Sequence, residues 1–212
     1  GWQKEMAEIV YLDSPLESEA LYERLCPPVR KWFKDKFPDF TRPQKLAIPA
    51  IMEKQHLLLC SPTGSGKTLT AFLTVIDQLV RLALERKLEK KVHAIYISPI
   101  KALANDIQRN LIGPLNEITE HYLPDRAQEI RVGLRTGDTS QSDRQKMLRN
   151  PPHILITTPE SLAIAITSPR FQPIVSEVEY MIIDELHSMV STKRGVHSVS
   201  YTHLRAHETS QH

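Results

Sequence analysis

The sequence predicts an α/β domain in which a parallel sheet carries helices on both faces. Short apolar runs rich in β-branched residues alternate with longer segments of helical periodicity. Polar turns follow the apolar runs, as expected where parallel strands end at one edge of a sheet. The 212 residues have room for one such domain with a full core and some extra helices.

The first part of the chain predicts three helices. Two short ones are expected at residues 17–25 and 28–37, and they should pack on the main domain. The second carries four large residues at helical spacing: Val29, Trp32, Phe33 and Phe37. The third follows Thr41, a suitable N-cap, and buries Ile48, Ile51 and Met52.

The rest of the chain predicts five buried strands separated by helices. The strands are expected at residues 57–60, 92–98, 130–134, 153–157 and 178–183. Between them we expect a helix to about residue 85, one to about residue 111, a polar helix at 142–149 and a helix that starts at 158–162.

A glycine-rich turn, SPTGSGKT, joins the first of these strands to the helix after it. Gly64 and Gly66 allow several backbone N–H groups to point inward at a phosphate chain. Lys67 supplies a positive charge for the terminal phosphates, and Thr68 supplies a hydroxyl for Mg²⁺. The strict pattern has Gly where this chain has Ser61. We therefore expect a nucleoside triphosphate site formed by Ser61, Pro62, Thr63, Gly64, Ser65, Gly66, Lys67 and Thr68.

An acidic pair closes the last predicted strand, in the sequence Asp184-Glu185-Leu186-His187. Carboxylates are costly at the end of an apolar strand unless they meet a cation. Asp184 would hold Mg²⁺, directly or through water, and Glu185 would activate the attacking water for cleavage of the γ-phosphate.

Gln44 lies near the start of the third helix, upstream of the glycine-rich turn. Its amide can pair with both the N6 and the N7 edge of adenine. The alternative is an ordinary exposed helix residue.

With these motifs in order, the chain resembles the first RecA-like domain of superfamily 2 helicases, and more narrowly the large helicase-related (Lhr) family. The stretches that carry the resemblance are FTRPQ, SPTGSGKTLTAFL, SPIKALANDIQRNL, RTGDT, PPHILITTPESL, IIDELH and KRGVH. The resemblance implies a RecA-like P-loop NTPase fold that uses ATP and Mg²⁺. It gives Gln44 the adenine-reading role, gives Lys67, Thr68, Asp184 and Glu185 the ATPase roles above, and makes His187 the link to the nucleic-acid face.

The resemblance also implies a path for single-stranded nucleic acid along the strand-to-helix turns. Such turns expose backbone N–H groups to phosphates without reading sequence. Thr158 and Pro159 are also a good helix start, and we expect both uses together. The residues on this path are Pro99, Lys101, Ala102, Gly137, Asp138, Thr158, Pro159 and Glu160.

The expected organisation has three parts. Residues 1–38 form a helical extension, residues 39–197 an incomplete first RecA-like domain truncated at its C-terminal side, and residues 198–212 a non-native tail. The tail contains VSYTHLRAHET, which resembles a translated sequencing-library transposase adapter. A second RecA-like domain of the same protein would complete the ATP site. Without it, this polypeptide should bind ATP-Mg²⁺ weakly, hydrolyse it slowly and not unwind a duplex.

Composition narrows the class of protein further. The 27 Lys and Arg against 25 Asp and Glu give a net charge of +2, so any nucleic-acid surface must be local. Cys26 and Cys60 lack metal-ligand spacing and indicate a reduced cytosolic compartment. No apolar run approaches the roughly 18 residues of a membrane span. We therefore expect a cytoplasmic protein without a membrane partner.

The resulting hypothesis is the ATP-binding motor half of an ATP-dependent DNA helicase that translocates on single-stranded DNA. One alternative is an RNA helicase of the same superfamily, because phosphate-gripping segments barely distinguish the sugars. The other is a nucleotide-gated nucleic-acid-binding module that never hydrolyses, against which the intact Glu185 argues.

Overall fold

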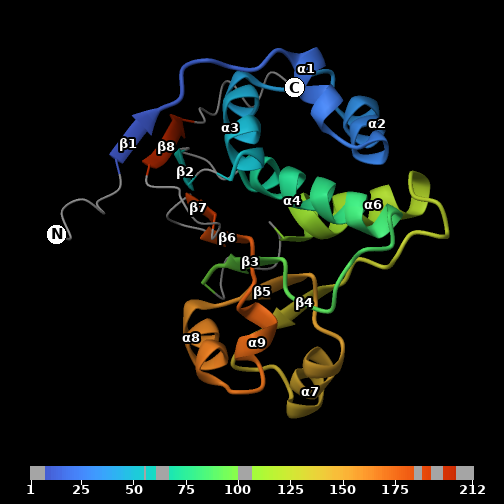
Figure 1. The fold of residues 1–212 in the computed structure, drawn as a ribbon, viewed down its shortest axis with the longest axis vertical. Helices are drawn as coiled ribbons and strands as arrows, with labels where there is room; N and C mark the ends of the chain where they lie inside the picture. The colour runs from blue at the N-terminus through green and yellow to red at the C-terminus, as the bar shows by residue number, and fades with distance from the viewer. Residues whose placement is uncertain are drawn as a thin grey trace.

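The computed structural model describes residues 8–54, 56–60, 67–99, 107–183, 188–191 and 198–203. Within these ranges one eight-stranded sheet runs through the molecule, with helices on both of its faces (Figure 1). None of the helices in this part of the chain has the length and apolar character that crossing a lipid bilayer requires.

The strands lie in the order β1-β8-β2-β7-β6-β3-β5-β4. All pairs are parallel except those of β7, which runs antiparallel to both β2 and β6. The five predicted strands are present as β2 to β6, which confirms the parallel sheet. The bounds are β1 Glu8–Tyr11, β2 His56–Cys60, β3 Ala94–Ile97, β4 Val132–Arg135, β5 Ile154–Thr157, β6 Tyr180–Ile183, β7 Ser188–Ser191 and β8 Ser198–His203.

Three strands were not expected from the sequence. β7 (SMVS) and β8 (SVSYTH) have no apolar run of more than two residues, and the apolar part of β1 (EIVY) is only three residues long. The pairing of these strands depends on backbone hydrogen bonds with neighbouring strands. β7 follows β6 after only residues 184–187, too few for the crossover that a parallel neighbour needs. β8 belongs to the segment 198–212 that we interpreted as a tail, and it lies between β1 and β2.

Helices α1 to α4 and α6 cover one face of the sheet, and α7, α8 and α9 cover the other (Figure 1). The predicted helix end near residue 111 is wrong, since the chain continues through a π-helix, η3, into α6. The helices are α1 Ser18–Arg24, α2 Pro27–Lys36, α3 Arg42–Met52, α4 Lys67–Leu84, η3 Gln108–Ile112, α6 Gly113–His121, α7 Gln141–Arg149, α8 Pro159–Thr167 and α9 Gln172–Val175.

Gly113 permits this unexpected continuation. Its backbone N–H donates to the carbonyl oxygen of Gln108, five residues earlier, which is the bond that defines a π-turn. A Cβ at this position would lie 2.9 Å from the same oxygen. A residue with a side chain would therefore push the turn apart.

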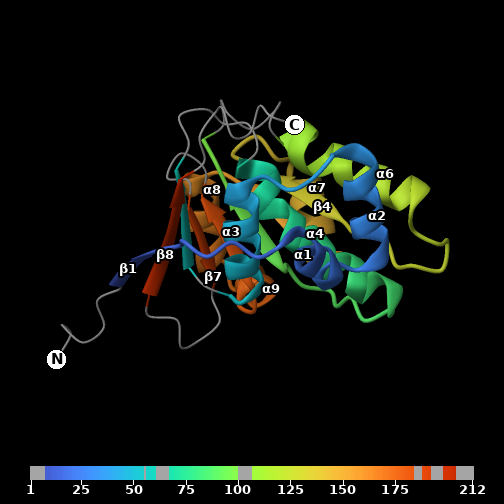
Figure 2. The same cartoon turned by 90° about the horizontal axis from the view of Figure 1, so that it is seen from above.

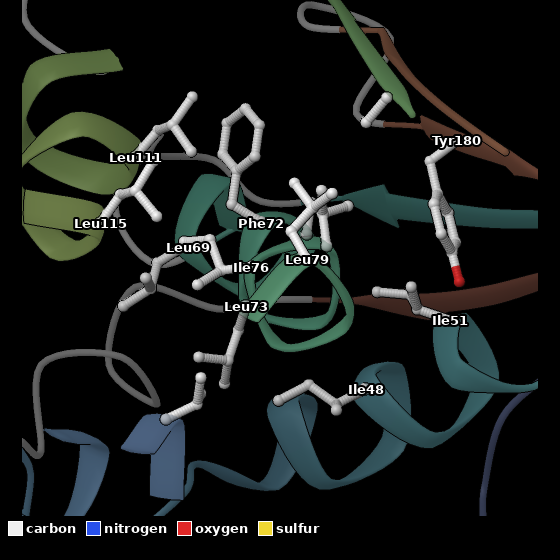
Figure 3. Close-up of a cluster of buried hydrophobic side chains, with 14 of the residues drawn as sticks. Ile48, Ile51, Leu69, Phe72, Leu73, Ile76, Leu79, Leu111, Leu115 and Tyr180 are labelled. Carbon is white, nitrogen blue, oxygen red and sulfur yellow. The ribbon is translucent and has the colours of Figure 1, made fainter. Parts of the chain in front are cut away.

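The strands alternate their side chains between two hydrophobic cores. Tyr96, Ile156 and Ile182 face the core under α3, α4 and α6, whereas Ile95 and Leu155 face the core under α8 and α9. Figure 3 shows α4 at the centre of the first core, surrounded by side chains from α3 and from the η3–α6 segment. Because successive side chains of a strand point to opposite faces, both faces of this sheet are apolar and both need helices to cover them.

Helices α1 and α2 pack on the main domain, as predicted. Phe33 stacks on Phe40 with a centroid distance of 4.2 Å, and both belong to the first core. Asp77 of α4 accepts the backbone N–H of Cys26 at 2.7 Å. Burial, followed by the charge of Asp77, raises the pKa of the Cys26 thiol to about 12, so this cysteine stays protonated.

His153 makes the stability of the fold depend on pH. It is buried before β5, its Nδ1 accepts the backbone N–H of Arg131 at 2.9 Å, and burial, then Arg131 and His93, lower its pKa to about 4. Above its ordinary pKa of 6.5 the ring is neutral in both the folded and the unfolded state. Below that pH only the unfolded chain takes up the proton, so the free energy of unfolding should fall by about 2 to 3 kcal/mol as the pH approaches 4.

Urea unfolding at about pH 7 and about pH 4.5 measures this loss. In His153→Asn the amide oxygen can still accept the Arg131 N–H, and the titrating ring is gone. The variant should therefore lose clearly less stability than the wild type between the two pH values. Equal losses in both proteins would contradict the assignment to His153.

Candidate nucleotide and nucleic-acid site

The carboxyl ends of the parallel strands meet at one edge of the sheet. Ile97 at the end of β3 lies opposite Thr157 and Ile183, the last residues of β5 and β6. Thr157 lies opposite Arg135 at the end of β4. β2 ends at the same edge, because Ser188 of β7 pairs with both Ile183 and Leu58. The carboxyl ends of β2 to β6 therefore lie at one edge of the sheet, and the described turns after β4 and β5 leave the sheet there. Figure 2 shows the fold from above, with β1, β8 and β7 toward one end of the sheet and β4 toward the other.

The described elements on either side of the glycine-rich turn are a strand and a helix. β2 ends at Cys60, and α4 begins at Lys67 and runs for 18 residues. Thr68, in the first turn of α4, is buried at this end of the helix. The N-terminus of a helix of this length carries a partial positive charge that favours anions.

Several predicted residues lie outside the described ranges. For Lys67 the structure gives the backbone position alone. The others are Ser61, Pro62, Thr63, Gly64, Ser65, Gly66, Lys101, Ala102, Asp184, Glu185 and His187. The described ends of β2 and β6 show that the chain reaches residue 61 and residue 184 from the same edge of the sheet.

Gln44 is held by a reciprocal cap at the start of α3. Its backbone N–H donates to the Thr41 hydroxyl at 3.2 Å, and its side-chain oxygen accepts the Thr41 N–H at 2.9 Å. The side chain is buried, so the alternative of an exposed helix residue is wrong. The sequence signal was available, because Thr-x-x-Gln before an apolar helix is the capping-box pattern. The cap fixes the orientation of the amide.

Pro99 lies half-buried directly beyond β3. The preceding residue, Ser98, is fully buried, and its N–H donates to the carbonyl of Thr157 at 3.1 Å. This bond extends the β3–β5 pairing by one residue, so Pro99 starts at the edge of the sheet.

Gly137 and Asp138 form the exposed tip of a tight turn after β4. The Thr139 hydroxyl accepts the N–H of Thr136 at 2.9 Å, and the Thr136 hydroxyl accepts the N–H of Asp138 at 3.3 Å. An added Cβ on Gly137 would meet no atom within 4 Å. The turn is therefore fixed by its own hydroxyls and presents an open backbone at its tip.

Thr158 caps α8, as predicted from the sequence. Its hydroxyl accepts the backbone N–H of Ser161 at 3.3 Å, and it is buried, whereas Pro159 and Glu160 are exposed. The cap places the N-terminus of a nine-residue helix at the same edge as the turn after β4.

Two arginines near this turn were missed from the sequence. Arg135 ends β4 as a buried residue, and Arg144 of α7 donates to the carbonyl of Thr136 at 3.3 Å. The available signal was a charged residue at the end of an apolar strand, the same argument that we applied to Asp184.

The opposite edge of the sheet carries a partly buried ion pair. The ammonium of Lys54 lies 2.7 Å from Oε2 of Glu179 and 4.2 Å from the centroid of the Tyr180 ring. Lys54 has a φ of 63° in the turn that joins α3 to β2, and Glu179 directly precedes β6. Lys54 therefore connects two segments of the chain. The first joins α3, which has Gln44 near its start, to β2 and the glycine-rich turn, and the second leads through β6 to Asp184.

Comparison with known proteins finds helicases. A family model described as DEAD/DEAH box helicase matches residues 41–211. The chain is 50% identical over 194 residues to the ATP-dependent helicase Lhr-Core of Methanocaldococcus jannaschii, an alignment covering 91% of this chain and 23% of that protein. It is 45% identical over 193 residues to the Lhr helicase/uracil glycosylase of Escherichia coli, covering 87% of this chain and 12% of that protein.

Among solved structures, the chain is similar to the Mycobacterium smegmatis helicase Lhr bound to ssDNA and AMP-PNP. The TM-score is 0.66 at 34% sequence identity, and the match covers 89% of this chain and 26% of that one. The chain thus spans less than a quarter of the length of the two curated relatives.

Proposed function

The chain belongs to the DEAD/DEAH box helicase family, and from this premise we propose that it supplies the ATP-binding part of a motor that translocates on and unwinds DNA. The observation that carries the proposal is the common edge at which β2 to β6 end. At that edge α4 begins with Lys67 and β6 leads into Asp184. The two exposed turns after β4 and β5 lie at the same edge.

In the proposed ATP site, each residue has a separate task. Lys67 and the backbone of residues 61–66 bind the phosphates, and the capped amide of Gln44 recognises adenine. The buried hydroxyl of Thr68 in the first turn of α4 suits a magnesium ligand, and Asp184 supplies the second. The metal, when bound, neutralises charge on the β- and γ-phosphates. Glu185 orients the attacking water, and His187 connects the site to the nucleic-acid face.

The proposed nucleic-acid path crosses the same edge. It runs over Pro99, Lys101 and Ala102, then over the turn at Gly137 and Asp138, and then over the start of α8. The solved Lhr structure contains ssDNA, which supports single-stranded DNA as the ligand. Backbone contacts of this kind do not by themselves separate DNA from RNA, so an RNA helicase remains the second candidate.

The proposed motor also needs a second RecA-like domain, which the length of the relatives allows. Such a domain would supply cationic groups for the transition state of phosphate cleavage. We therefore propose that residues 39–197 bind ATP-Mg²⁺ weakly by themselves, and that robust unwinding requires the additional domain. We also propose that residues 198–212 are a non-native, adapter-derived tail, of which residues 198–203 pair in the sheet through their backbone.

The function is tested by ATP hydrolysis in a full-length relative with single-stranded DNA and RNA of identical length and sequence. We expect DNA to stimulate hydrolysis several-fold more than RNA. Stronger stimulation by RNA would favour the RNA helicase. The change corresponding to Glu185→Gln should reduce turnover by about 100-fold or more, and unchanged turnover would favour the non-hydrolysing binding module.

A further inference from the structure

Two arginine side chains come together where β4 ends. Arg135 is the last residue of β4, and only 7% of its surface is exposed. Its guanidinium carbon lies 4.5 Å from the centroid of the buried Phe171 ring. Arg144 approaches from α7 and bonds to Thr136, the next residue after Arg135. One arginine is thus held by a ring face and the other by the turn.

The charges of these arginines are not neutralised by the described part of the protein. Burial, and then the positive charge of Arg144, lower the pKa of Arg135. No described carboxylate lies within ion-pair distance of either guanidinium. Nε of Arg144 is buried without a hydrogen-bond partner. Arg135 is buried and Arg144 is partly buried. A buried cation is costly unless an anion accompanies it, so an anion bound by the two guanidinium groups would lower this cost.

A third positive feature lies beside the pair. The hydroxyl of Thr157 donates to the carbonyl oxygen of Arg135 at 2.7 Å, which ties the end of β4 to the end of β5. Helix α8 begins two residues after Thr157, and its capped N-terminus adds a partial positive charge. The acidic residues next to this place, Asp138 and Glu160, are exposed and make no described ion pair with the arginines.

We propose that Arg135 and Arg144 form a binding site for a phosphate oxyanion at the end of β4. A guanidinium presents a planar set of N–H donors that matches two phosphate oxygens, and stacking on Phe171 fixes the plane of Arg135. The site adjoins the turn at Gly137 and Asp138, so its natural ligand is one phosphodiester of the single strand. Only this last step rests on the proposed function, because a free phosphate ion would satisfy the same chemistry.

A purely structural role makes the opposite prediction for stability. If Arg135 were only a support for Phe171, its removal would destabilise the protein, and phosphate would have no specific effect. If Arg135 is a ligand-binding residue, Arg135→Met replaces a costly buried cation with an apolar side chain that also packs on an aromatic ring. The variant should then be as stable as the wild type without phosphate and should lose the response to phosphate.

The experiment has two arms that separate the sources of the anion. In the first, thermal unfolding is followed with inorganic phosphate and with chloride at equal ionic strength. Phosphate should raise the unfolding midpoint of the wild type but not that of Arg135→Met. Arg149→Met is the control and should respond like the wild type, because Arg149 is an exposed arginine at the end of α7, the helix that carries Arg144. Arg135→Lys keeps the positive charge and loses the planar set of N–H donors, so phosphate should raise its unfolding midpoint less than that of the wild type. This variant still tests the site if Arg135→Met fails to fold.

In the second arm, fluorescence anisotropy measures binding of a single-stranded DNA of about 12 nucleotides. Arg135→Met should weaken binding about tenfold and reduce the slope of log K against log salt by about 0.7, whereas Arg149→Met should change neither much. A phosphate response without any change in DNA binding would overturn the phosphodiester assignment. No phosphate response in the wild type would overturn the site. ATP binding by the same variants should be unchanged. If the wild type does not bind ATP, that result counts against the proposed function and not against the phosphate site.

Discussion

Replacement of Lys67 by alanine is expected to weaken ATP binding by about 100-fold or more, the largest effect that we predict on ligand binding. Lys67 is the first residue of α4 and follows the turn that β2 leads into. A lysine there meets the most highly charged part of the nucleotide, and each hydrogen bond to a charged group contributes about 1.5 to 3 kcal/mol. Two such bonds to the phosphates account for a loss of this size.

Titration of the purified chain with a fluorescent ATP analogue and Mg²⁺ measures this loss. Lys87→Ala is the matched control, since Lys87 is exposed and its described ion pair is with Glu85. Lys67→Arg should retain part of the affinity because it keeps the charge. A dissociation constant for Lys67→Ala within about twofold of the control would show that the turn does not bind phosphates.

Replacement of Phe33 by alanine is expected to lower the free energy of unfolding by about 3 to 5 kcal/mol. Phe33 is 1% exposed, stacks on Phe40, and lies 4.8 Å from the ring centroid of Phe37. The substitution removes the ring that joins α2 to the segment before α3. A cavity in a cluster of rigid rings is filled poorly by relaxation, so both the lost burial and the void contribute.

Urea unfolding of Phe33→Ala, Phe33→Leu and Lys31→Ala tests this expectation. Leucine fills most of the cavity and should cost clearly less than alanine. Lys31 lies on the exposed face of the same helix, so its replacement should change stability by less than about 0.5 kcal/mol. A loss below about 1 kcal/mol for Phe33→Ala would mean that α1 and α2 do not belong to the cooperative unit.

The sequence was sufficient for the elements whose signal is local. Apolar runs such as those of β3 and β5 are buried on both faces, so they stand out from their polar neighbours. The capping of α8 by Thr158 was also local, since cap and helix are adjacent in the chain. The carboxyl ends of the predicted strands meet at one edge because strands joined by crossovers run in the same direction.

The remainder depends on partners distant in the sequence. β7 and β8 are strands only because β2, β6 and β1 offer backbone groups to them. The continuation through η3 depends on one glycine next to a proline, a pair that ordinarily indicates a helix end. The contact of Arg135 with Phe171 joins two layers of the fold, and no periodicity in the sequence encodes it.

The ion pair of Lys54 and Glu179 has a mechanical consequence. In the motor that we propose, the ATP site and the nucleic-acid path must keep their relative positions while ATP is hydrolysed. Lys54 precedes β2, which leads to the glycine-rich turn, and Glu179 precedes β6, which leads to the acidic pair. Their ion pair lies at the amino ends of the two strands. The contact therefore ties the amino ends of β2 and β6 together at the edge of the sheet away from the predicted ATP site.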